Sequence, residues 1–164
     1  MVERSLDGLL AWLHPVDFGV MGHGWAMHGR DYLIVVQDML GSNPGTHELT
    51  FTHCVRLDFE TRVRDDVWPR SWSDEFLEYQ RWVAAGEPDG YVWGTNWSNA
   101  YPGLEARADS RAAAEWANRL GKDMSEATVE TDRFHLRLIF HSVSWRKLGD
   151  DIDTISQVHI PLEP

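Results

Sequence analysis

Histidine is the residue type with the most chemical potential in this sequence, because imidazole binds transition metals and transfers protons near neutral pH. Five of the eight histidines lie before residue 54, and Asp17 or Glu48 could complete a ligand set with them. These five are the candidate metal ligands: His14, His23, His28, His47 and His53.

The spacing of these histidines does not favour a metal site. The sequence has no His-Glu-x-x-His, no His-x-His and no paired cysteines. Along one strand, His47 and His53 would lie roughly 20 Å apart at about 3.3 Å per residue, too far to share an ion. Zinc needs three or four ligands in a tetrahedral array. We therefore expect no metal and no other cofactor, with the histidines hydrogen-bonded within a sheet.

Nucleophilic catalysis has little support either. Cys54 is the single cysteine and follows His53 directly. Successive residues of a strand point to opposite faces, so these two side chains cannot form a dyad in a regular strand. The sequence also lacks a Gly-x-Ser-x-Gly elbow. The residue pattern favours a protein that is not an enzyme.

The most distinctive segment runs from residue 91 to 102, where aromatic rings alternate with small polar groups. Flat rings beside amide and hydroxyl groups suit a sugar or peptide ligand, which needs both stacking area and oriented hydrogen bonds. The alternative is a packed loop whose rings cover the edge of the core. The candidate binding residues are Tyr91, Trp93, Asn96, Trp97, Asn99 and Tyr101.

Charge narrows the class of partner. Lys and Arg total 15 and Asp and Glu total 26, which gives a formal net charge of −11. Such a surface repels phosphate backbones, so nucleic acid and anionic membranes are not expected partners. A basic protein or a cation is the partner that the charge favours. Nothing in the sequence predicts an oligomeric state.

The cellular location expected from the sequence is the cytoplasm. One cysteine allows no internal disulfide. Residues 1–7 lack the basic and apolar regions of a signal peptide, and no apolar run approaches 18 residues.

The elements that must position these residues follow from hydrophobic periodicity. Strict alternation predicts one long strand over residues 47–59, with His47, Leu49, Phe51 and His53 on a single face. Further strands are predicted at 32–36, 126–130, 133–145 and 155–162. Helical spacing predicts helices at about 6–13, 71–86 and 111–120, capped by serine at the start. The glycine-rich stretch 22–29 is interpreted as a hairpin turn, with a ligand-binding loop as the alternative.

These elements predict one α+β domain over residues 1–164, with a mainly antiparallel β-sheet packed by about three short helices. One internal echo suggests a duplicated β unit, because His47 and His53 have the same spacing as His135 and His141. The second strand, however, has its better apolar face opposite its histidines.

One pattern runs through most of the chain: a Leu-His-Pro-x-Asp start at residues 13–17, the strands near 33–36 and 49–55, and the segments 91–97 and 137–141. In this pattern the chain resembles the YxiG-like group of small bacterial proteins. Pro15 and Val16 separate His14 from Asp17, where immunity-like relatives have His directly followed by Asp. The resemblance implies a neighbourhood of polymorphic-toxin and immunity genes, and it carries no catalytic residues.

We therefore expect a non-catalytic, cytoplasmic protein-binding protein of the immunity type. Two alternatives stay open: a metal-dependent enzyme that uses His and a carboxylate, and a sugar-binding module built on the aromatic segment.

Overall fold

Alternating apolar residues along the chain form eight strands in a computed structural model that describes residues 5–13, 18–38, 43–71, 79–88 and 97–148. The strands are β1 (Phe18–Ala26), β2 (Asp31–Asp38), β3 (Gly45–Thr52), β4 (Arg56–Thr61), β5 (Ser98–Ala106), β6 (Ser125–Thr131), β7 (Phe134–Phe140) and β8 (Ser142–Lys147). The helices are α1 (Leu6–Trp12), α2 (Trp68–Ser71), α3 (Tyr79–Ala84) and α4 (Arg111–Leu120), with a 3-10 turn, η1 (Met27–Gly29), between β1 and β2.

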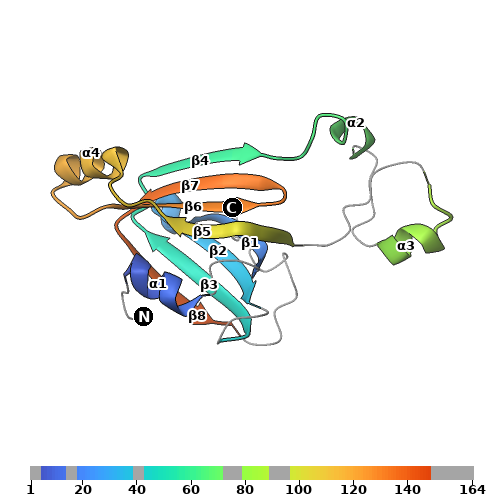
Figure 1. Cartoon of the computed structure of the whole chain (residues 1–164), viewed down its shortest axis with the longest axis horizontal. Helices are drawn as coiled ribbons and strands as arrows, with labels where there is room; N and C mark the ends of the chain where they lie inside the picture. The colour runs from blue at the N-terminus through green and yellow to red at the C-terminus, as the bar shows by residue number, and fades with distance from the viewer. Residues whose placement is uncertain (1–4, 14–17, 39–42, 72–78, 89–96, 149–164) are drawn as a thin grey trace.

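All strand pairs are antiparallel, in the order β4-β7-β6-β5-β1-β2-β3-β8 (Figure 1). The predicted α+β fold with a mainly antiparallel sheet is confirmed. The glycine-rich stretch is a hairpin, with residues 22–26 in β1 and the turn itself at η1.

The long strand predicted over residues 47–59 is wrong in one respect, because it breaks after Thr52. His53 takes a left-handed backbone, with φ of 48°, and its side chain is exposed rather than on the inner face. The segment that pairs with it is also interrupted, at His141 between β7 and β8. Hydrogen bonds from the Val55 amide to the Ile139 carbonyl (2.8 Å) and from the His141 amide to the Thr52 carbonyl (3.0 Å) hold the two chains together across the break.

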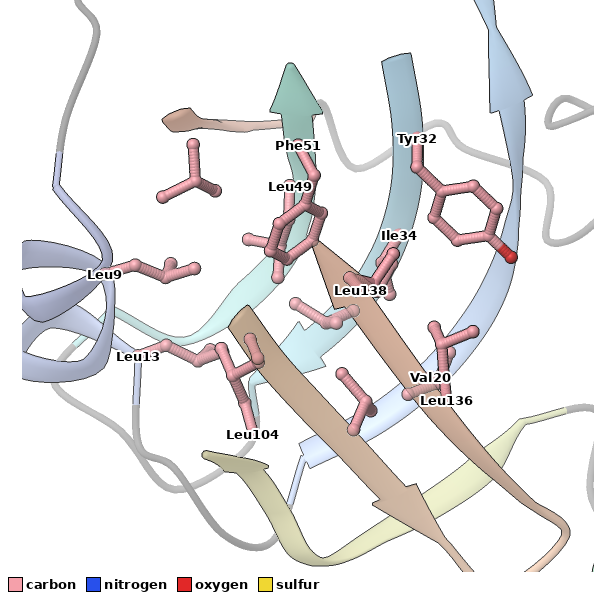
Figure 2. Close-up of a cluster of buried hydrophobic side chains, with 14 of the residues drawn as sticks. Leu9, Leu13, Val20, Tyr32, Ile34, Leu49, Phe51, Leu104, Leu136 and Leu138 are labelled. Atoms are coloured by element: carbon pink, nitrogen blue, oxygen red, sulfur yellow. The ribbon is translucent and has the colours of Figure 1, made fainter. Parts of the chain in front are cut away.

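These breaks close the sheet on itself. β4 follows β3 along the sequence, and β8 follows β7. Because β3 pairs with β8 and β4 pairs with β7, the two ends of the strand order are joined through these two bent segments. Side chains from both halves therefore point into one interior, as Figure 2 shows for Val20, Ile34, Leu49 and Leu136.

The topology repeats, although the histidine spacing does not mark the repeat. In the first half of the chain, β1, β2 and β3 are consecutive neighbours in the sheet, and β8 lies next to β3. In the second half, β5, β6 and β7 are consecutive neighbours, and β4 lies next to β7. β1 and β5 pair where the two halves meet. His47 is buried with the interior residues of β3, whereas Leu136 and Leu138 fill the interior from β7. His135 is adjacent to Leu136 and so lies on the other face.

Two of the predicted helices are present as α1, which packs against β5 and β8, and α4, which packs against β6 and β7. The Ser5 hydroxyl accepts a hydrogen bond from the Gly8 amide (3.1 Å) at the start of α1, and Leu9 of α1 and Leu13 just after it enter the core (Figure 2). Ser110 caps α4 in the same way, accepting from the Ala113 amide (3.0 Å). Gly121 ends α4 with φ of 64°, a left-handed conformation that glycine adopts without strain.

The helix predicted at residues 71–86 is described at its two ends, at Ser71 in α2 and over α3, and both elements lie beyond the end of β4 (Figure 1). Residues 72–78 and the strand predicted at 155–162 lie outside the described residues.

Candidate functional site

The five candidate metal ligands lie in different surroundings. His47 is 1% exposed and its Nε2 donates to the Asn43 carbonyl (2.7 Å). His28 is exposed on η1, and exposed His53 packs edge-on against His141 with 6.0 Å between ring centres. His14 lies outside the described residues. Within those residues, no three His, Cys, Asp or Glu side chains are gathered closely enough to hold a metal ion.

His23 belongs to an aromatic cluster. Its Nδ1 shares a hydrogen bond with the Tyr32 hydroxyl (2.5 Å), and its ring lies 4.8 Å from Phe134 and 5.6 Å from Phe59. Burial lowers the pKa of His23, because an apolar environment disfavours the imidazolium. The cluster therefore keeps His23 neutral and tied to Tyr32.

Cys54 is not activated for nucleophilic chemistry. Burial raises the pKa of its thiol to about 11, and the thiol donates to the Arg56 carbonyl (3.4 Å). Since the thiolate is the reactive form, the thiol is inert at neutral pH.

The strongest electrostatic feature was not predicted from the sequence. The Glu126 side chain is 1% exposed and accepts two hydrogen bonds from Arg137, at 2.7 and 2.9 Å. The Ser110 hydroxyl also donates to it, and Arg107 lies 3.6 Å away. Burial alone would raise the pKa of Glu126, but the hydrogen bonds from Arg137 and Ser110 outweigh burial and hold it below its ordinary value. The cluster fixes the start of α4 to β6 and β7.

Two open cavities, of about 610 and 400 Å³, lie on either side of the chain that carries Arg107 and Ser110. Glu126 lines both, yet its oxygens already accept hydrogen bonds. This carboxylate therefore has a structural partner at each oxygen.

The predicted aromatic segment is described only in its second half. Tyr91, Trp93 and Asn96 lie outside the described residues, whereas Trp97 comes just before β5, and Asn99 and Tyr101 are in it. The strand register shifts between Ala100 and Gly103, so the chain bulges at Tyr101. Tyr101 is 73% exposed, the highest value among the large hydrophobic residues that the structure describes.

Trp97 is half-buried against β1. Its indole Nε1 donates to the Asn99 side-chain oxygen (3.2 Å). A Cβ on Gly19 would stand only 2.9 Å from the Trp97 ring, so glycine is needed there for the ring to lie on the strand. The exposed Asp132 adjoins Asn99, because its amide donates to the Asn99 carbonyl (2.9 Å). We call Trp97, Asn99, Tyr101 and Asp132 the β5 bulge surface.

A family comparison identifies the chain. The model of the YxiG-like protein family matches residues 2–157. The chain belongs to the YxiG-like protein family. The resemblance seen in the sequence is thereby confirmed, and the match includes the closed sheet and the β5 bulge surface of this YxiG-like protein.

Other comparisons add no function to this YxiG-like protein. No curated protein matches it. Among solved structures it is similar to a crystal structure of an uncharacterized protein from Neisseria gonorrhoeae, with 7% sequence identity and a TM-score of 0.36, over 81% of this chain and 93% of that chain. None of its described helices has the length and apolar character needed to span a membrane.

Proposed function

We propose that this YxiG-like protein is a non-catalytic binding protein that contacts a basic protein partner through the β5 bulge surface. The exposure of Tyr101 carries the proposal. A ring that is 73% exposed, next to exposed Asn99 and Asp132, resembles the centre of a protein interface, where tyrosine is enriched.

The charge of the chain supports a basic partner. A net charge of −11 attracts a positively charged protein and accelerates its encounter. Exposed Asp132 carries one such charge, and its amide is hydrogen-bonded to the carbonyl of Asn99, two residues before Tyr101. A Lys or Arg of the partner would pair with this carboxylate and stack on Tyr101. An immunity-type protein that neutralises a basic toxin is the role that these properties favour.

The state of the reactive groups also supports binding rather than catalysis. The Cys54 thiol is protonated at neutral pH, and Glu126 is held by Arg137 and Ser110. His23 is held against Tyr32. Each of these groups has a structural partner that accounts for its burial.

Site-specific photo-cross-linking tests the proposal. A benzophenone amino acid replaces Tyr101 in one variant, and in the matched control it replaces Leu120, an apolar residue on α4 that is 48% exposed. In a lysate of the native host, we expect a basic protein to be cross-linked from position 101 and not from position 120, with the yield falling when the salt concentration of the lysate is raised. Identical products at both positions, or an acidic protein from position 101, would contradict the proposal.

A sugar-binding role uses the same ring and gives a different result. Ring stacking on Tyr101 with a hydrogen bond to Asn99 would bind a glycan independently of salt. Binding of the purified protein on a glycan array, lost in Tyr101→Ala, would favour that alternative over a protein partner.

A further inference from the structure

A third hollow, separate from the two cavities beside Glu126 and from the β5 bulge surface, opens between α1, the turn before β3 and the end of β8. Its volume is about 660 Å³, within the range of small-molecule sites. Seven residues line it: Trp12, Asn43, Pro44, His47, Trp145, Arg146 and Lys147.

Three aromatic rings build the wall of this hollow. The Trp12 ring meets His47 edge-on at 4.6 Å between ring centres and lies 5.3 Å from Trp145. Trp12 comes from α1, His47 from β3 and Trp145 from β8, so the wall forms only when the chain is folded. His47 and Trp145 are buried and Trp12 is partly exposed, so Trp12 is the ring that offers stacking area to a flat ligand.

His47 has an unused acceptor. Its Nε2 lies 2.7 Å from the Asn43 carbonyl, and because a carbonyl oxygen only accepts, Nε2 carries the hydrogen. In the neutral imidazole, Nδ1 then keeps a lone pair. Nδ1 is buried and has no hydrogen-bond partner in the described part of the chain. A buried acceptor without a donor is unfavourable, so a ligand N–H or O–H that reaches it gains affinity.

Lys147 supplies positive charge at the same place. It lies directly opposite His47 in the pairing of β3 with β8, and its Nζ donates to the Pro44 carbonyl (3.0 Å). An ammonium carries three donors, so others can meet an anion. The neighbouring Arg146 is different, because it already pairs with Glu48 at 2.9 Å.

We propose that this hollow binds a small aromatic carboxylate that also carries a ring N–H or O–H. The ring stacks on Trp12, the carboxylate pairs with Lys147, and the ligand donor meets Nδ1 of His47. The chemistry fits a hydroxyphenyl or indolyl acid. The site is independent of the proposed protein-binding function.

Calorimetric titration tests this with three matched probes: 4-hydroxyphenylacetate, phenylacetate, which lacks the donor, and 4-hydroxyphenylacetamide, which lacks the charge. We expect 4-hydroxyphenylacetate to bind with a Kd of about 1 mM or lower, and each of the other probes to bind about tenfold more weakly. Equal affinity for the three probes, or no binding of the first at 10 mM (on the order of ten times that Kd), would overturn the proposal.

Two variants assign the effect to residues. Lys147→Gln should weaken 4-hydroxyphenylacetate about tenfold or more, whereas Lys122→Gln removes the same charge from a residue after α4 that does not line the hollow, and should change affinity less than about twofold. His47→Phe should abolish the difference between 4-hydroxyphenylacetate and phenylacetate. Equal losses in the two charge variants would refute the site. If His47→Phe does not fold, the comparison of the three probes on the wild-type protein still tests the proposal.

Discussion

Replacing Glu126 with glutamine removes a buried negative charge that lies among positive groups. Glu126→Gln keeps the shape of the side chain and an oxygen that can accept from Ser110 or Arg137. It loses the ionic part of the contacts to Arg137 (2.7 Å) and Arg107 (3.6 Å). The arginines are left beside a neutral group.

The magnitude follows from how exposed each partner is. Breaking a fully buried ion pair destabilises a protein by about 3–5 kcal/mol, because a charge is left without compensation. Glu126 is 1% exposed, but the Arg137 side chain is 27% exposed and regains water on one side. We therefore expect the free energy of unfolding to fall by about 2–3 kcal/mol.

Urea denaturation followed by tryptophan fluorescence measures this change. Glu115→Gln is the matched control, since Glu115 pairs with Arg111 on the surface of α4, where such pairs contribute less than about 0.5 kcal/mol. A loss below about 0.5 kcal/mol in Glu126→Gln, or an equal loss in both variants, would refute the assignment of Glu126 as a stabilising ion-pair centre.

The pH dependence has a definite sign. The folded-state pKa of Glu126 lies below its ordinary value of 4.5. Its contribution to stability is therefore complete above pH 4.5 and is lost as the pH falls through the folded-state pKa. The difference in unfolding free energy between wild type and Glu126→Gln should shrink below pH 4.5, and a difference that grows there would contradict the account.

Three further predictions concern the core, the thiol and the metal content. Leu49→Ala should lower the free energy of unfolding by about 2–5 kcal/mol in urea titrations, because Leu49 is fully enclosed; a loss below about 1 kcal/mol would speak against this core. The Cys54 thiol, with a pKa of about 11, should react with a disulfide reagent at pH 8 (a fraction at or below about 0.1% thiolate) only on the timescale of unfolding, and rapid labelling of folded protein would contradict that pKa. Elemental analysis of purified protein should find less than about 0.1 transition metal ion per chain, and one ion per chain would restore the histidine hypothesis.

Much of the fold followed from local pattern. The alternation of His47, Leu49 and Phe51 predicted the inner face of β3, and the serine caps of α1 and α4 predicted where those helices begin. These signals are local, since each depends on residues within one or two turns of the chain.

The closure of the sheet did not follow from local pattern. The alternation of apolar and polar residues continues through His53 although its backbone is left-handed. The pattern therefore predicted one strand where the structure has β3 and β4. The pairing of β3 with β8 joins residues about a hundred positions apart, such as Glu48 with Arg146, and no local signal specifies such a partner.

The candidate sites were likewise predicted in part from local sequence, while the rest depends on contacts between distant elements. The aromatic segment was predicted from its residue types, but the bulge that exposes Tyr101 depends on its register against β6. The contacts of Glu126 with Arg137 and of His47 with Trp12 come from separate elements, and the residue types alone did not predict them.

The central claim is that Tyr101 contributes to binding and little to folding. The partner identified by cross-linking is purified on its own, and its Kd is measured for wild type and for Tyr101→Ala. The Tm of both proteins is measured in the same buffer. We predict a Kd at least tenfold weaker for Tyr101→Ala, with a Tm within about 2 °C of wild type, because truncating an exposed interface residue leaves the core intact. An unchanged Kd, or a Tm lowered by about 5 °C or more, would contradict the claim.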